Sequence, residues 1–178
     1  MSINFILIQL IGVVAWIILV ISYYKPNTNK ILVYHLIASI LYCIHYYLLS
    51  AYSGLFICIL EVVRDFLYYK TDLDKYIFYG LIPIYIIYGI LKFDNVLDLL
   101  PILSSMIDAY SLTKNKKIIL IGAIISYTLW FIYNISVMSV SGFITDLILA
   151  LSNLSILLFN FNPFNYKEKD KKGLILKK

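Results

Sequence analysis

Three charged residues interrupt an otherwise apolar stretch of the sequence, and they are the first candidates for chemistry. Glu61, Arg64 and Asp65 lie within residues 55–69, where the other residues are apolar or aromatic. On a helix their spacing places them along one stripe. A charge at the middle of a bilayer costs about 2.5–3.5 kcal/mol, so the stripe should face protein or water. Either Arg64 neutralises its neighbours as an internal brace, or the cluster serves a ligand.

His45 adds a group that can change protonation near neutral pH. It precedes the turn near residue 53 and Glu61 follows that turn, so a helical hairpin would bring the two side chains to a similar depth. A protonatable pair in a wet cavity could relay protons or bind a ligand. The alternative is that His45 packs between helices and donates to a backbone carbonyl. The sequence leaves both interpretations open.

A second polar group lies near the end of the chain. Trp130 and Asn134 are four residues apart, and Asp146 and Asn153 are seven apart, so each pair lies on one helical face. If the faces meet, Trp130 can stack on a polar, uncharged solute while an Asn amide donates and accepts hydrogen bonds. Alternatively, the two Asn residues only join helices to each other. Further candidates are Gln9, Ser104, Ser105 and Asp108.

The composition shows what kind of element must position these residues. Of the 178 residues, 62% are hydrophobic and 16% aromatic, and the mean hydropathy is +0.87, whereas a soluble domain needs a more polar surface. Seven apolar stretches are each close to the roughly 20 residues that cross a bilayer as a helix. They are residues 5–23, 31–49, 55–69, 77–91, 96–112, 118–137 and 142–159. The sequence therefore predicts an all-α membrane protein with seven transmembrane helices.

Tyrosines gather at the ends of these stretches, where a ring can lie among lipid headgroups with its hydroxyl in water. They include Tyr23, Tyr24, Tyr46, Tyr47, Tyr52, Tyr68, Tyr69 and Tyr76. We expect them to anchor the helices rather than to do chemistry. Cys43 and Cys58 lie inside predicted spans without metal-ligand spacing, so we expect no disulfide, metal or other cofactor.

The positive charges alternate between the two sides of this arrangement. All of the 15 Lys and Arg residues except Arg64 and Lys92 follow the first, third or fifth stretch or lie in the tail. Those in the loops are Lys25, Lys30, Lys70, Lys75, Lys114, Lys116 and Lys117. Because short basic loops stay cytoplasmic, we expect the N-terminus outside and the C-terminus inside. The net charge of +5 then faces the lipid bilayer, and nucleic acid is not an expected partner.

The sequence also resembles itself at an offset of 88 residues. Asn27 matches Asn115, and Ser53-Gly54 matches Ser141-Gly142. Three spans per repeat would invert the second copy, and one intervening span restores its orientation. We therefore expect two parallel three-helix bundles, residues 1–70 and 96–160. A connector helix within 71–95 would join them, and residues 161–178 would form a basic cytoplasmic tail.

This 3+1+3 plan resembles the sugar-transporting SWEET proteins and the wider PQ-loop group in architecture only. The residues themselves resemble the YgjV-type bacterial inner-membrane proteins, in segments 9–14, 45–64 and 99–102 and in Trp130, Asn134, Gly142, Asp146 and Asn153. The resemblance extends to about residue 161 and implies a multi-pass inner-membrane location and a helical fold, but no substrate. Glu61 stands where the family leads us to expect Asn, so a neutral hydrogen-bonding role does not carry over to it.

Two functions of different classes follow from these observations. No phosphate-binding loop and no hydrolase or metalloprotease motif is present, so we do not expect an enzyme. The leading hypothesis is a transporter or facilitator of a small polar solute. Its pathway would lie between the two bundles and involve His45, Glu61, Trp130, Asn134, Asp146 and Asn153. The alternative is a structural or regulatory membrane protein whose polar residues only brace helices.

Overall fold

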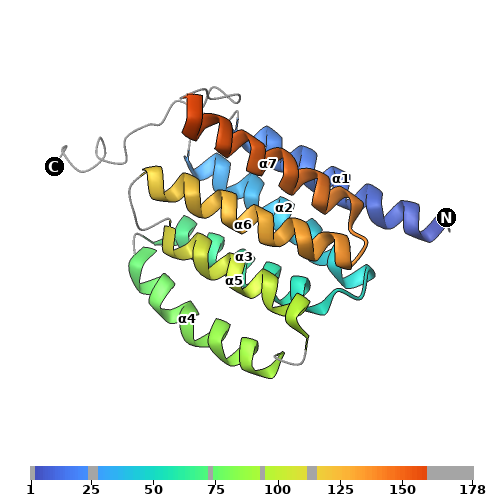
Figure 1. Ribbon diagram of the computed structural model, residues 1–178, viewed down its shortest axis with the longest axis horizontal. Helices are drawn as coiled ribbons and strands as arrows, with labels where there is room; N and C mark the ends of the chain where they lie inside the picture. The colour runs from blue at the N-terminus through green and yellow to red at the C-terminus, as the bar shows by residue number, and fades with distance from the viewer. Residues whose placement is uncertain (1–2, 24–27, 72–73, 93–94, 112–115, 160–178) are drawn as a thin grey trace.

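The protein folds into a group of packed helices (Figure 1). The structure is a computed structural model and describes residues 3–23, 28–71, 74–92, 95–111 and 116–159. Over these residues the all-helical prediction is confirmed, since they contain seven helices and no strand. The helices are α1 (Ile3–Tyr23), α2 (Thr28–Leu48), α3 (Tyr52–Lys70), α4 (Asp74–Leu91), α5 (Val96–Ser111), α6 (Lys116–Ser136) and α7 (Val140–Phe159). The predicted basic tail and the loop residues Lys25, Lys114 and Asn115 lie outside the described residues.

Two of these helices are both long and apolar enough to cross a membrane, through Asn4–Ile21 in α1 and Val140–Phe159 in α7. Shorter apolar runs occupy Val33–Leu48, Tyr76–Leu91 and Leu120–Ser136. Many large apolar side chains are exposed on the outside of the molecule, among them Leu7 at 54% and Ile90 at 70%. A surface of this kind suits contact with lipid rather than with water.

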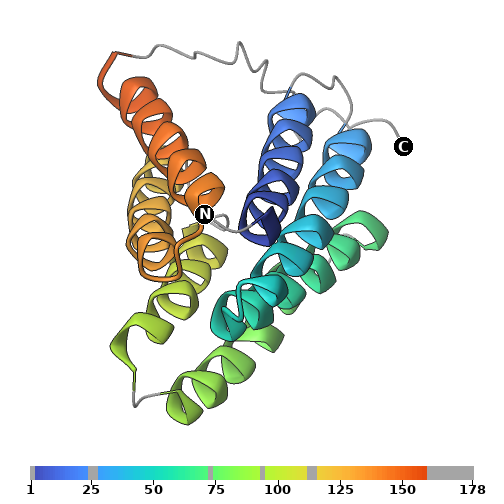
Figure 2. The ribbon, with the colours of Figure 1, turned by 90° about the vertical axis from the view of Figure 1, so that its right-hand side faces the viewer.

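The helices pack in chain order. α2 lies between α1 and α3, and α6 lies between α5 and α7. α1 also contacts α7, and α3 contacts α5, so these six helices close into a ring. α4 lies outside the ring, against α3 and α5. Figure 2 shows α1 and α7 approaching at one end of the molecule and diverging toward the other.

Two turns at the same end of the molecule have the same geometry. In each, a residue with φ of 57° ends a helix, and the next N–H donates to a carbonyl five residues back, which is a Schellman motif. The residues with positive φ are Ser50 and Met138, and the backbone bonds run from Ala51 to Tyr46 and from Ser139 to Asn134, both at 2.9 Å. Corresponding residues of the two turns are 88 positions apart in the sequence.

Gly12 allows α1 to approach α7 closely. A Cβ atom at this position would lie 2.9 Å from Cβ of Ser141 and 3.0 Å from Cε1 of His45, which is closer than packed atoms tolerate. Gly80, on α4, has no neighbouring atom within 4 Å of the same position. The small residue at Gly12 therefore sets the distance between the two helices.

We predict that Gly12→Ala lowers the melting temperature of the protein in detergent, because α1 must move away from α7. Gly80→Ala is the matched control. It should leave the melting temperature unchanged or raise it slightly, since Ala is favoured over Gly in a helix by about 0.5–1 kcal/mol. Equal melting of the two variants would contradict the close contact.

Candidate solute-binding site

The six helices of the ring line a cavity of about 170 Å³. Its lining comes from α1, α2, α3, α5, α6 and α7, so both ends of the sequence contribute. The side chains on which the site is built are Tyr46, Glu61, Arg64, Asp108, Trp130, Asn134 and Asp146. A space of this size suits a small solute. Its polar lining is unusual for the interior of a membrane protein, where such residues are costly and mark functional sites.

A chain of hydrogen bonds joins three helices at one end of the cavity. The hydroxyl of Tyr46 on α2 donates to Oδ1 of Asn134 on α6 at 2.8 Å. Nδ2 of Asn134 then donates to Oδ2 of Asp146 on α7 at 2.7 Å. Each donor has an acceptor, so the amide and the carboxyl group are held in fixed orientations. The chain places one polar group from each of the three helices at the cavity wall.

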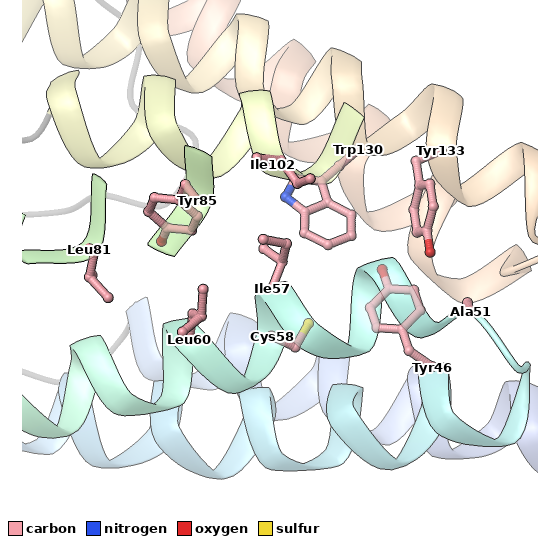
Figure 3. Close-up of a cluster of buried hydrophobic side chains, with 10 residues drawn as sticks. All are labelled: Tyr46, Ala51, Ile57, Cys58, Leu60, Leu81, Tyr85, Ile102, Trp130 and Tyr133. Atoms are coloured by element: carbon pink, nitrogen blue, oxygen red, sulfur yellow. The ribbon is translucent and has the colours of Figure 1, made fainter. Parts of the chain in front are cut away.

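Aromatic rings form the wall next to this chain. Tyr46 and Trp130 are stacked, with ring centroids 5.7 Å apart and planes inclined by 24°. Tyr133 lies edge-on to Trp130 at 5.7 Å, and its hydroxyl accepts a hydrogen bond from the backbone N–H of Gly54 at 2.8 Å. Figure 3 shows Trp130 reaching from α6 toward Cys58 on α3. These contacts leave the indole ring in a defined position at the cavity.

The charged cluster of α3 lines the cavity as well. Nε of Arg64 donates to Oδ1 of Asp65 at 3.2 Å, so the ion pair forms between neighbours in the sequence. Oε1 of Glu61 instead accepts a hydrogen bond from Ser105 of α5 at 3.0 Å. Nη1 of Arg64 is buried without a hydrogen-bond partner among the described residues. Asp108, also on α5, completes this charged wall.

His45 has a different environment from Glu61. It is fully buried, with Nδ1 2.9 Å from the carbonyl of Ile8 and Nε2 2.8 Å from Oγ of Ser139. A carbonyl can only accept, so Nδ1 carries a proton and the Ser139 hydroxyl can donate to Nε2. His45 is not among the residues that line the cavity. It joins α1 and α2 to the turn before α7.

Gln9 makes further hydrogen bonds near His45, where α1 meets the turn before α7. Its Nε2 donates to the carbonyl of Met138 at 2.9 Å, and its Oε1 accepts from the backbone N–H of Ser141 at 3.2 Å. Together with His45, it fixes the first turns of α1 and the last turns of α2 against the start of α7. These hydrogen bonds join α1, α2 and α7 at the end of the molecule where α1 and α7 meet.

Asn153 lies apart from the other proposed pathway residues. Its Nδ2 donates to the carbonyl of Leu149, one turn earlier in α7, at 2.8 Å, and it is not among the residues that line the cavity. The amide of Asn153 thus stays on its own helix. The structure brings together Glu61, Trp130, Asn134 and Asp146 of the proposed set, and gives His45 and Asn153 other surroundings.

Tyr46 corrects one interpretation from the sequence. Its place at the end of an apolar stretch predicted a headgroup anchor, but it is buried, with 3% of its surface exposed, and bonds to Asn134. Tyr47 and Tyr52 are 61% and 58% exposed, as an anchor requires. The signal that could have distinguished Tyr46 from the anchoring tyrosines is its position 88 residues before Asn134, which is the offset at which the sequence resembles itself.

Both cysteines are free thiols, Cys43 partly buried and Cys58 buried. Within the part of the chain that the structure describes, no three His, Cys, Asp or Glu side chains are grouped so that they could hold a metal ion.

Comparison with known protein families agrees with this helical, lipid-facing architecture. A family described as Imp-YgjV, bacterial inner membrane protein, matches residues 6–161. The chain belongs to the Imp-YgjV family. The match covers every one of the seven helices, apart from the first residues of α1, and so includes the whole cavity. No curated protein and no solved structure matches the chain.

Proposed function

We propose that this Imp-YgjV protein is a transporter or facilitator of a small polar solute, and that the solute passes through the cavity inside the ring. The observation that supports this most is the polar lining of the cavity, drawn from the five helices α2, α3, α5, α6 and α7. Here Glu61, Trp130 and Asp146 line a space that a solute could occupy.

We also propose that the protein consists of two parallel three-helix halves joined by α4. The two Schellman turns support this division, because their corresponding residues are 88 positions apart. The same offset relates Tyr46 to Asn134, which bond to each other between α2 and α6. α1 contacts α7 as α5 contacts α3, which a pseudo-twofold relation between the halves would produce. The pathway would then follow the interface between the halves.

The proposed orientation places the N-terminus and the two Schellman turns outside the cell. We predict that Tyr52→Cys and Met138→Cys, at positions 58% and 66% exposed, react with an impermeant thiol reagent added to intact cells. Lys117→Cys, at the other end, should react only after the membrane is opened. Ser53 and Ser141 are unsuitable probes because both are buried. Cys43 and Cys58 are replaced beforehand, so that the introduced cysteine is the one that reacts. Labelling of Lys117→Cys in intact cells would show the opposite orientation.

Transport itself is tested with the purified protein in liposomes. The measurement is the influx of labelled sugars, amino acids and small amines, compared with empty liposomes. Faster influx of at least one solute is the expected result. If no solute of the panel enters faster, the transport proposal fails and the bracing function remains, for which the Arg64–Asp65 ion pair and the Asn134–Asp146 hydrogen bond are the supporting contacts.

A further inference from the structure

We propose that the solute of this cavity carries both an ammonium and a carboxylate group, as a small α-amino acid does. The inference rests on the proposed transport function and names its substrate class. It is motivated by two features of the same wall: an excess of carboxyl groups, and a guanidinium group that is only partly used.

The excess of carboxyl groups in the cavity lining favours a solute with a positively charged group. Four carboxyl groups line the cavity, those of Glu61, Asp65, Asp108 and Asp146, together with the guanidinium of Arg64 and the imidazole of His35. Of the four, Asp65 is paired with Arg64. The hydrogen bonds that Ser105 gives to Glu61 and that Asn134 gives to Asp146 add no charge. Carboxylates away from water are stabilised by a countercharge, and an ammonium group is one that can enter and leave.

The guanidinium of Arg64 favours a solute that also carries a negatively charged group. The residue is 8% exposed, Nε is taken by Asp65, and Nη1 has no hydrogen-bond partner among the described residues. A buried donor without an acceptor is costly. The planar guanidinium suits a carboxylate, which can accept two parallel bonds. A simple amine would leave Nη1 unpaired, and a simple carboxylic acid would add another carboxyl group to a lining that already holds four.

The spacing of the two features fits one molecule. Glu61 and Arg64 are three residues apart on the cavity side of α3, which corresponds to a rise of about 4.5 Å along the helix. In an α-amino acid the ammonium and the carboxylate are attached to the same carbon, so they can meet two such neighbouring groups. The cavity volume of about 170 Å³ and the nearby ring of Trp130 then favour a small solute.

The test uses three small compounds of nearly the same shape with the purified full chain in detergent. They are L-alanine, with both charged groups, alaninamide, which lacks the carboxylate, and propionate, which lacks the ammonium. We expect L-alanine to raise the melting temperature in a concentration-dependent way. Each analogue should need at least about tenfold more ligand for the same shift, because it loses one charge-assisted contact.

Two conservative variants assign the contacts. Arg64→Lys keeps a positive charge beside Asp65 but loses the guanidinium, and Glu61→Gln keeps an acceptor for Ser105 but loses the charge. In both variants the L-alanine concentration for a half-maximal shift should rise about tenfold while the melting temperature without ligand stays near that of the parent. Asp98→Asn, which removes a carboxylate outside the cavity lining, should bind L-alanine as the parent does.

The outcomes separate this inference from the transport proposal. If alaninamide acts as well as L-alanine, the carboxylate has no role and the inference fails, while transport of amines remains possible. If L-alanine gives no shift but liposomes take up a sugar, the substrate class is wrong and the transport function stands. Binding of L-alanine that Arg64→Lys leaves intact would also overturn the assignment.

Discussion

Arg64→Ala should destabilise the protein by about 3–5 kcal/mol, the cost of removing one partner of a buried ion pair. Arg64 and Asp65 are 8% and 6% exposed, and their side chains are joined at 3.2 Å. Without the guanidinium, the carboxylate of Asp65 would be left without countercharge in a wall that also holds Glu61 and Asp108. Thermal unfolding in detergent measures the effect.

Two further variants show whether the lost charge balance is the cause. Glu61→Gln should melt close to the parent, because an amide oxygen can still accept the hydrogen bond from Ser105. The double variant with Arg64→Ala and Asp65→Ala should be more stable than Arg64→Ala alone, since no unpaired charge remains. If Glu61→Gln is the least stable of the three, Glu61 rather than Asp65 is the essential partner of Arg64.

The helices were predictable because their signals are local. An apolar stretch of suitable length is visible in the sequence whatever it packs against, and all seven predicted stretches correspond to helices. The differences occur at the ends. The prediction began the third helix at Leu55, whereas α3 begins at Tyr52, because the Schellman turn at Ser50 already reverses the chain and leaves Tyr52 and Ser53 free to join the helix.

The site was harder to predict because it depends on which faces meet. The sequence placed Asn134 and Asp146 on faces that could face each other, but it could not show that Tyr46 completes their hydrogen-bonded chain. A Tyr at a helix end has the same sequence signature whether it faces lipid or a neighbouring helix. Asn153 shows the opposite case, since its spacing from Asp146 suits a shared site while its amide bonds within α7.

The pairing of charges illustrates the same limit. Glu61 and Asp65 are both within reach of Arg64 along a helix, at three residues and one residue. In the structure Ser105 of α5 donates a hydrogen bond to Glu61, and Arg64 pairs with Asp65. The hydrogen-bond partner of Glu61 is thus a residue 44 positions away in the sequence, which the spacing within the third stretch does not indicate.

Trp130→Ala should reduce solute influx into liposomes by about tenfold or more, if the cavity is the pathway. The ring stacks on Tyr46 at 5.7 Å and lines the cavity. An aromatic face attracts a cationic group by about 0.5–2 kcal/mol, and each 1.4 kcal/mol of lost binding is a tenfold change. Removing the indole also takes away one of the two aromatic rings that stack on Tyr46, the other being Tyr42. Both effects act at the cavity and not on the lipid-facing surface of the protein.

Loss of folding must be separated from loss of the site, because truncation of a buried Trp commonly destabilises a protein by about 3–5 kcal/mol. Phe131→Ala is the matched control: it removes the neighbouring aromatic ring of α6, which packs edge-on against Phe143 at 6.1 Å and does not line the cavity. Trp130→Phe keeps an aromatic face and should restore part of the influx. If influx per folded molecule falls equally in Phe131→Ala and Trp130→Ala, the aromatic wall has no specific part in transport and the bracing function is favoured.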